Sequence, residues 1–217
     1  MKAETITEKI KIAAIASEKI TGKNLSLPVL KSILLIAKQK SLIIKATNLD
    51  IGIEYEIPAK VEEDGVVAIP GTILGGMLSN LYGEETIKIE SVNNNILLST
   101  KNNSTILKTT PYEDFPLIPK ISSKESIIVS VEKLITGLRA VCYSASLSDI
   151  KPEISSVYLY QNEKNIIFVA TDSFRLAEKK IENKKNMNFD GSIIPLKNIT
   201  EIIRVLGDCS GEVEIKF

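Results

Sequence analysis

The chain repeats itself at a spacing of 124 to 125 residues, and this internal repeat constrains the fold more than any other feature of the sequence. Proline, serine and apolar positions recur in the same order in both halves of the chain. Ordered matches at one spacing indicate two copies of one folding unit. The matching segments are 27–35 with 151–159, 43–47 with 167–171, 69–70 with 194–195, and Leu81 with Leu206.

The repeat also sets the expected domain organisation, because a unit of about 124 residues has the size of an ordinary domain. We expect a first domain at residues 1–121 and a second at 122–217, joined within the proline- and serine-rich stretch 111–124. The first copy contains a hairpin pattern at 95–109 that the second copy lacks. The second domain is therefore expected to be truncated at its C-terminal end, with no third domain.

Two stretches of each copy have helical periodicity, and strand-like runs surround them. One apolar stripe follows residues 132–146, whereas residues 50–57 alternate between apolar and polar side chains like a half-buried strand. These patterns predict an α+β fold in which two helices cover the sheets of each repeat. The expected helices are 8–20, 71–82, 132–146 and 196–206. The expected strands are 29–35, 42–47, 50–57, 86–90, 95–99, 105–109, 156–160, 165–170 and 212–217.

The chain contains no histidine and only two cysteines, which excludes several kinds of chemistry. A His general base, a Ser-His-Asp triad and a His-ligated metal are all impossible. Cys142 and Cys209 cannot complete a four-ligand zinc site, and we expect both to be buried in a protein of a reducing compartment. Phosphate-binding and calcium-binding loop patterns are also missing. We therefore expect no metal, no cofactor and no enzymatic activity.

Basic and acidic residues balance at 27 each, so the formal net charge is zero. Bulk positive charge is thus excluded as the basis of nucleic-acid binding, while a local basic face remains possible. Lys197, Glu201 and Arg204 lie on the side of helix 196–206 opposite its apolar face. This side is either a solvated surface or one that contacts phosphates.

The helix expected at 71–82 has an uncharged outer face that contains Gly75 and Gly76. Each glycine weakens a helix by about 1 kcal/mol relative to alanine. We therefore expect that another group approaches this face closely or that the helix is distorted there.

Neither a targeting segment nor a membrane span is predicted. Charged residues interrupt the first 17 residues, and the longest apolar runs are far shorter than the about 20 residues that a membrane helix needs. We expect a cytoplasmic protein.

One local cluster is unusual, the stretch Ala-Thr-Asp-Ser-Phe-Arg-Leu-Ala at 170–177. It follows an apolar strand and combines an arginine with an adjacent phenylalanine. The cluster is either a plain turn between strands or a recognition site.

Together with five other segments, this cluster resembles the bacterial DNA polymerase III beta subunit family, the sliding clamps. The resemblance covers the whole chain in order, and the 170–177 segment is specific to the family. The segments that carry it are 27–30, 46–51, 110–116, 151–158, 170–177 and 194–197.

The resemblance implies repeated clamp domains, each with antiparallel sheets on the outside and two helices on the inner face. Family members form head-to-tail dimer rings that encircle duplex DNA, contact it without sequence preference and tether the replicative polymerase as processivity factors. Since the family has three repeats, this chain by itself is expected not to close a ring. A clamp-fold interaction module that never encircles DNA remains an alternative, and a small enzyme on the same scaffold is a more distant one.

The resemblance also implies three groups of site residues. A pocket for short peptides of polymerases, the clamp loader and repair proteins is implied at Ile154, Thr171, Ser173, Phe174, Arg175 and Leu176. Phe174 stands where the family commonly has histidine. The implied DNA-facing residues are Lys19, Lys23, Asn24, Lys133, Lys197 and Arg204, and Asn24 replaces a common basic residue. The implied dimer-interface residues are Ile106 and Leu107.

Overall fold

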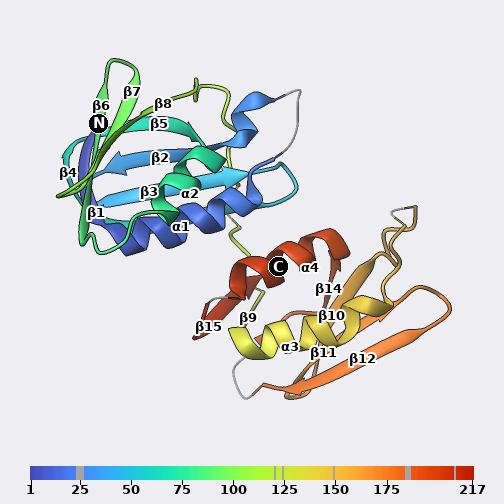
Figure 1. Cartoon of the computed structure of the whole chain (residues 1–217). Helices are drawn as coiled ribbons and strands as arrows, with labels where there is room; N and C mark the ends of the chain where they lie inside the picture. The colour runs from blue at the N-terminus through green and yellow to red at the C-terminus, as the bar shows by residue number, and fades with distance from the viewer. Residues whose placement is uncertain (23–26, 120, 124, 149, 184–186, 208) are drawn as a thin grey trace. The chain divides into compact units, whose positions relative to one another are not determined.

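The computed structural model describes residues 1–22, 27–119, 121–123, 125–148, 150–183, 187–207 and 209–217. The chain divides into two compact units, unit 1 at residues 1–118 and unit 2 at residues 119–217 (Figure 1). The division falls within the proline-rich stretch 111–124.

Unit 1 contains an eight-stranded antiparallel sheet in the order β5-β2-β3-β4-β1-β6-β7-β8. Helices α1 and α2 lie side by side on one face of this sheet (Figure 1). Its elements are β1 (Lys2–Ile6), α1 (Thr7–Ile20), the 3-10 helix η1 (Pro28–Lys31), β2 (Ser32–Lys38), β3 (Ser41–Thr47), β4 (Gly52–Glu63), β5 (Gly65–Pro70), α2 (Gly71–Ser79), β6 (Thr86–Val92), β7 (Asn95–Ser99) and β8 (Ser104–Lys108).

Unit 2 contains a four-stranded sheet in the order β12-β11-β10-β14 and a three-stranded sheet in the order β13-β9-β15. Helices α3 and α4 pack against these strands and against each other. Its elements are β9 (Ser126–Ser130), α3 (Val131–Val141), the 3-10 helix η2 (Cys142–Ser144), β10 (Ser156–Asn162), β11 (Asn165–Thr171), β12 (Leu176–Glu182), β13 (Met187–Asn188), β14 (Ser192–Pro195), α4 (Leu196–Leu206) and β15 (Glu212–Lys216).

The two units share their order of elements from β1 to β6 in unit 1 and from β9 to β15 in unit 2, as the sequence repeat predicts, and the β7-β8 hairpin of unit 1 has no counterpart among the described residues of unit 2. Strands β10 and β11 begin and end 124 residues after β2 and β3. The order β5-β2-β3-β4 in unit 1 corresponds to β14-β10-β11-β12 in unit 2. The long strand β4 pairs first with β3 and then with β1, whereas its counterpart is divided between β12 and β13. The α+β fold with two helices over the sheets of each repeat is therefore confirmed.

The core of each unit lies between the helices and one face of the sheets. In β2, Ile33, Leu35 and Ala37 are fully buried beneath α1 and α2, following the two-residue period of a strand. In unit 2, the predicted apolar stripe of α3 is confirmed, because Leu134 and Leu138 are buried in the core cluster. Apolar burial of this kind supplies most of the free energy that stabilises such a fold.

Three element boundaries differ from the sequence-based expectation. Residues 29–31 form part of η1 rather than a strand, because Pro28 lacks an N–H and its fixed φ suits the first position of a helical turn. Helix α2 ends at Ser79 instead of 82, where the side-chain amide of Asn80 donates to the carbonyl of Gly76. Helix α3 ends at Val141 and continues as the 3-10 turn η2.

Two smaller expectations have opposite outcomes. The close approach expected at Gly75 and Gly76 is confirmed only at Gly75, where a Cβ would overlap the carboxylate of Glu18 in α1. Gly75 is buried against α1 and does not belong to the outer face of α2. The expectation that both cysteines are buried is wrong, since Cys142 is half-buried and Cys209 is exposed. Cys209 lies just after α4, where the chain leaves the core.

Two helix glycines provide a matched test of the packing. A Cβ at Gly137 would overlap the ring of the buried Phe168, whereas a Cβ at Gly76 would meet no atom within 4 Å. We predict that Gly137→Ala lowers the free energy of unfolding of unit 2 by about 1–3 kcal/mol through overpacking. Gly76→Ala raises that of unit 1 by about 0.5–1 kcal/mol, because alanine has the higher helix propensity. Urea unfolding followed by circular dichroism measures both, and equal effects would contradict the described packing.

Candidate functional site

The turn between β11 and β12 holds five of the six residues predicted for the peptide pocket. The Thr171 hydroxyl donates to the carbonyl of Arg175 at 2.7 Å and accepts from the amide of Ser173 at 3.1 Å. Ser173 has a positive φ of 76°, which reverses the chain. The turn is thus held by the side chain of its first residue.

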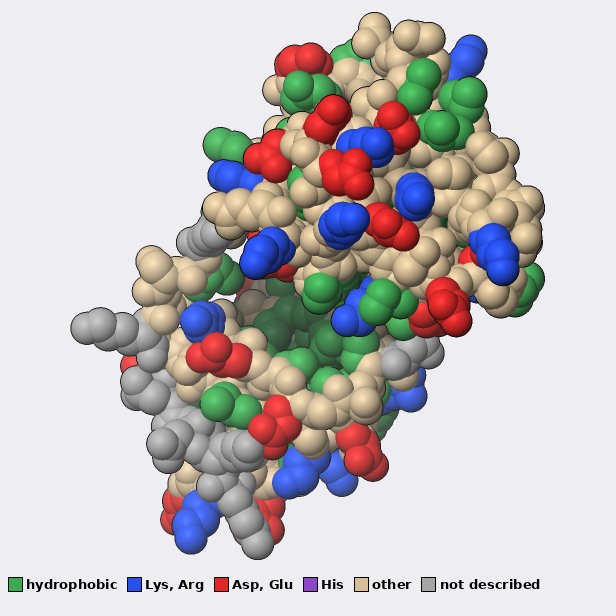
Figure 2. Space-filling view, turned by 90° about the vertical axis from the view of Figure 1, so that its left-hand side faces the viewer, with side chains coloured by type: hydrophobic (Ala, Val, Ile, Leu, Met, Phe, Trp, Pro, Cys, Tyr) green, Lys and Arg blue, Asp and Glu red, His purple; other side chains and the backbone are tan. Residues whose placement is uncertain are grey.

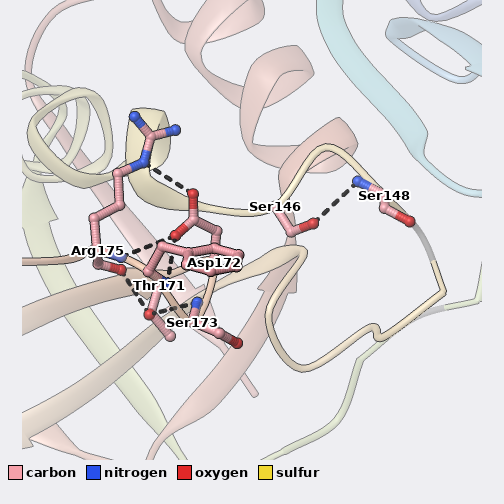
Figure 3. Close-up of polar contacts among 7 residues, drawn as sticks. Ser146, Ser148, Thr171, Asp172, Ser173 and Arg175 are labelled. Atoms are coloured by element: carbon pink, nitrogen blue, oxygen red, sulfur yellow. Dashed lines mark hydrogen bonds and ion pairs between the residues drawn. The ribbon is translucent and has the colours of Figure 1, made fainter.

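Asp172 supplies the remaining hydrogen bonds of this turn (Figure 3). Its Oδ1 accepts from the amides of Phe174 and Arg175, and its Oδ2 accepts from Nε of Arg175, all at 3.0 Å. The two backbone amides, assisted by the charge of Arg175, hold the pKa of Asp172 below its usual range. The carboxylate therefore stays ionised while it orders the backbone around Phe174.

The same turn occurs in unit 1, between β3 and β4. The Thr47 hydroxyl donates to the carbonyl of Ile51 at 2.9 Å and accepts from the amide of Leu49, whose φ is 77°. Oδ1 of Asn48 accepts from the amides of Asp50 and Ile51. Since the same hydrogen bonds recur 124 residues away, this turn is a feature of the repeated domain. The two copies of the turn differ in the side chains that they expose.

In unit 2 the turn displays apolar and cationic groups to solvent. Phe174 is 98% exposed and Leu176 is 66% exposed. The guanidinium of Arg175 lies 5.8 Å from the centre of the Tyr143 ring, within the range of a cation–π contact. The hydrogen-bonded turn at 171–176 therefore holds exposed apolar side chains on an ordered backbone.

The sixth predicted residue, Ile154, lies in the turn before β10. It is half-buried, and its carbonyl accepts from the amide of Ser146 at 2.8 Å. Figure 3 shows the segment of Ser146 and Ser148 beside the turn of Thr171 and Arg175. The structure therefore brings Ile154 to the same end of the sheet as the other five residues.

Sequence reasoning missed Tyr143, Leu147 and Ile150 of the segment that precedes β10. Tyr143 is 62% exposed, and Leu147 and Ile150 are still more exposed. Their large apolar side chains were the available signal, because Tyr143 lies off the apolar stripe of the helix expected at 132–146, and Leu147 and Ile150 follow that helix.

The predicted DNA-facing residues that the structure describes all lie in helices, namely α1, α3 and α4. Lys19 lies in the last turn of α1, and Lys197 lies exposed in the first turn of α4. Lys133 donates to the carbonyl of Glu182 at 2.7 Å, and Arg204 forms an ion pair with Glu201. Lys23 and Asn24 lie outside the described residues.

The two predicted interface residues lie on β8, which pairs only with β7 among the described strands. Ile106 is 62% exposed, whereas Leu107 is buried in the core of unit 1. Neighbouring residues of a strand point to opposite faces. Of these two residues, only Ile106 therefore points its side chain to the outside of unit 1.

The strand surface of unit 1 that includes β1, β4 and β6 carries interspersed basic and acidic side chains (Figure 2). Lys2 pairs with Glu62 at 3.1 Å, and this hydrogen-bonded contact lowers the pKa of Glu62 and raises that of Lys2. Lys60 also approaches Glu62 at 4.0 Å. A surface of such balanced charge does not attract a polyanion, in contrast to a basic face.

The described residues contain no cluster of three or more carboxylates and thiols that could hold a metal ion. Within the same residues, no helix is long and apolar enough to cross a membrane.

Comparison with protein families gives consistent matches over both units. Residues 4–119 match the N-terminal domain, and residues 128–217 the central domain, of the DNA polymerase III beta subunit. The beta sliding clamps of Staphylococcus epidermidis and Staphylococcus aureus are each 26% identical to the chain over 200 residues. These matches cover 88% of this chain but only 53% of each relative, so the chain spans about half the length of these curated relatives.

Solved structures show the same fold. The DNA polymerase III subunit beta of Pseudomonas aeruginosa aligns with a TM-score of 0.89 at 22% identity, covering 100% of this chain and 60% of that one. The DNA polymerase sliding clamp of Bacillus subtilis aligns with a TM-score of 0.89 at 21% identity, with the same coverage. A further Pseudomonas aeruginosa sliding clamp, solved with griselimycin bound, aligns with a TM-score of 0.88 at 22% identity and covers 59% of its chain.

The hydrogen bonds of Asp172 give a prediction for the turn. Asp172→Asn keeps an oxygen that accepts from the amides of Phe174 and Arg175, as Asn48 does in unit 1, whereas Asp172→Ala removes it. We expect the amide chemical shifts of Phe174 and Arg175 to stay near native in the first variant and to become coil-like in the second. Nuclear magnetic resonance spectroscopy measures them, and coil-like shifts in both variants would contradict the proposed role of Oδ1.

The lowered pKa of Asp172 also gives a pH dependence with a definite sign. A carboxylate with a depressed folded-state pKa stabilises its structure above the unfolded value and loses this contribution as the pH falls through the folded value. The amide chemical shifts of Phe174 and Arg175 are thus expected to change as Asp172 is protonated. The midpoint of this change lies below pH 3.8, the ordinary pKa of an aspartate side chain. The Asp172→Asn protein serves as the control, in which this titration is absent.

Proposed function

The chain belongs to the DNA polymerase III beta subunit family, and from this premise we propose that it forms part of a DNA sliding clamp. This processivity factor encircles duplex DNA and tethers the replicative polymerase. The observation that carries the proposal is that the two units match, in order, the N-terminal and central domains of the family. The shared topology of the units supports it, because a ring is built by repeating one domain.

The proposed mechanism is topological and non-catalytic. A closed ring stays on DNA without tight binding, so its inner face needs only weak contacts to phosphates that carry no sequence information. The helices of each unit lie together on one face of the sheets, and Lys19 and Lys197 project from them. Lys133 and Arg204 lie in α3 and α4, where Lys133 donates to the carbonyl of Glu182 and Arg204 pairs with Glu201.

The turn at 171–176 is proposed to receive short peptides of the polymerase, the clamp loader and repair proteins. Its backbone is fixed by Thr171 and Asp172, so the binding surface is organised before the peptide arrives. Phe174 and Leu176 supply the exposed apolar area that anchors such a peptide. The terminal nitrogens of Arg175 are directed past Asp172 and can donate to peptide carbonyls (Figure 3).

The ring is proposed to close as a head-to-tail homodimer through the edge strand β8. This strand carries a row of backbone groups without a partner strand among the described residues, and Ile106 adds an exposed apolar side chain. Edge strands with these properties readily pair with another chain. Replication takes place on the chromosome, so we propose that the protein acts in the cytoplasm of a bacterium.

The decisive experiment loads the protein, in its full natural length, onto primed circular DNA with a clamp loader. We predict that it remains bound through gel filtration at high salt as long as the circle is closed. It is released when one restriction cut linearises the DNA, and protein blocks at the two DNA ends restore retention. Equal retention on circular and linear DNA would instead identify an interaction module that does not encircle DNA.

A second experiment tests the turn with a matched control. Phe174→Ala removes the exposed ring from unit 2, and Leu49→Ala changes an exposed apolar residue of the equivalent turn in unit 1. We expect the first variant to weaken binding of a labelled polymerase-derived peptide at least about tenfold, as loss of an apolar anchor does. The second variant retains native affinity. Fluorescence polarisation measures both, and equal affinities of both variants would contradict the assignment.

A further inference from the structure

In unit 1, a single carboxylate ties the tip of the β7-β8 hairpin to the loop between α2 and β6. Oε1 of Glu84 accepts from Nδ2 of Asn102 at 3.1 Å and from Nδ2 of Asn103 at 3.3 Å. Glu84 is half-buried, whereas both asparagines are exposed. Hydrogen bonds to a carboxylate are stronger than those between neutral groups, so this contact holds two segments of unit 1 together at one oxygen.

The turn at the hairpin tip is closed without the help of these two side-chain amides. The amide of Thr100 donates to the carbonyl of Asn103 at 2.8 Å, and the amide of Asn103 donates to the hydroxyl of Thr100 at 3.1 Å. Because the backbone and the Thr100 hydroxyl close the turn, the carboxamides of Asn102 and Asn103 are left to bind Glu84.

The loop that carries Glu84 is itself anchored to α1. Nζ of Lys11 donates to the carbonyl of Leu81 at 3.2 Å. The amide of Thr7 donates to the carbonyl of Glu85 at 3.0 Å. Glu84 lies between these two attachments, so it offers the hairpin tip a fixed point on the helix side of unit 1.

Strand β8 has little packing of its own, because Leu107 is the one buried residue among its five. At the end away from the tip, the hydroxyl of Thr109 donates to the carbonyl of Asn94 at 2.6 Å, and the amide of Thr110 donates to the carbonyl of Ala68 at 2.9 Å. A hairpin with few buried apolar side chains opens readily. The order of β8 therefore depends on the attachments at its two ends.

The carboxylate is not a requirement of the repeated fold. Cys209 stands at the position of Glu84, at the spacing of 125 residues that relates Leu81 to Leu206. A thiol is only a weak acceptor and cannot replace a carboxylate oxygen that binds two amides. The contribution of Glu84 is therefore specific to unit 1 and its hairpin.

We propose that Glu84 is a positioning residue for the edge strand β8, which it orders before that strand pairs with a second chain. The inference rests on the ring closure through β8 that is proposed above. Attachment of the tip to the loop at 80–85 removes conformational freedom that β8 would otherwise lose on pairing, and such preorganisation strengthens association. The carboxylate acts through Asn102 and Asn103.

The first measurement follows the hairpin in the 217-residue chain by amide hydrogen exchange. Glu84→Ala removes both hydrogen bonds, whereas Glu84→Gln keeps an oxygen that can accept them. Glu85→Ala is the matched control, since it removes the same charge from an exposed neighbouring residue. We expect exchange at residues 100–108 to become at least about fivefold faster in Glu84→Ala, and to stay near native in the other two variants.

The second measurement uses the protein in its full natural length and follows its dimer by sedimentation over a range of concentrations. Glu84→Ala is expected to raise the dissociation constant about three- to tenfold, because β8 is no longer ordered in advance. Glu84→Gln and Glu85→Ala keep a near-native dissociation constant. A dimer weakened equally by Glu84→Ala and Glu85→Ala would assign the effect to lost charge and overturn the proposal.

A double-mutant cycle shows whether Glu84 acts through the two asparagines. In the Asn102→Ala/Asn103→Ala background, Glu84→Ala is expected to cause no further weakening of the dimer, because the contact that it removes is already absent. An equal effect of Glu84→Ala in both backgrounds would contradict the proposed role.

Ile106→Asp separates this inference from the proposed ring closure, because it changes the exposed apolar residue of β8 itself. A native dissociation constant in Ile106→Asp would contradict closure through β8 and, with it, the role of Glu84. A weakened dimer in Ile106→Asp together with a native dimer in Glu84→Ala would leave the closure standing and overturn the role of Glu84 alone.

Discussion

Packing of two helices against one face of each sheet is the constraint on which the rest of the structure depends. Phe168 of β11 is fully buried where α3 offers Gly137, so helix and sheet approach closely at that point. Because this contact uses one face of each element, two surfaces are left to water, the outer side of the helix pair and the far side of the sheet. Among the described residues proposed to face DNA, Lys19 lies in α1 and Lys197 in α4.

The sequence predicts most of this architecture because its signals are local. Helical periodicity located α1, α3 and α4, and the repeat fixed the common topology. The strands β1, β5, β9, β12, β13 and β14 were not predicted. β1 and β9 pair with strands that are distant in sequence, and β13 and β14 have only two and four residues, too few to show a period. The 3-10 turn at Pro28 was read as a strand, since apolar residues follow the proline without interruption.

The candidate site shows where sequence reasoning stops. The resemblance identified the turn at 171–176, and the structure adds that Thr171 and Asp172 fix it, as Thr47 and Asn48 fix its counterpart. The sequence could not show that Leu107 points into the core while Ile106 points outward, because these directions depend on the register of β8. Nor could it show Tyr143 beneath Arg175, a contact between segments more than 30 residues apart.

The two copies of the turn also show which interactions hold it. Asn48 carries no charge, yet its Oδ1 accepts the same two amides as Oδ1 of Asp172. The ion pair of Asp172 with Arg175 is therefore not needed for the conformation, and an exposed pair of this kind contributes little to stability. Its effect is to orient Arg175 toward Tyr143 through one nitrogen. The same backbone conformation thus carries uncharged turn residues in unit 1 and exposed cationic and apolar side chains in unit 2. The side chains that are proposed to bind a peptide are therefore not required for the conformation of the turn.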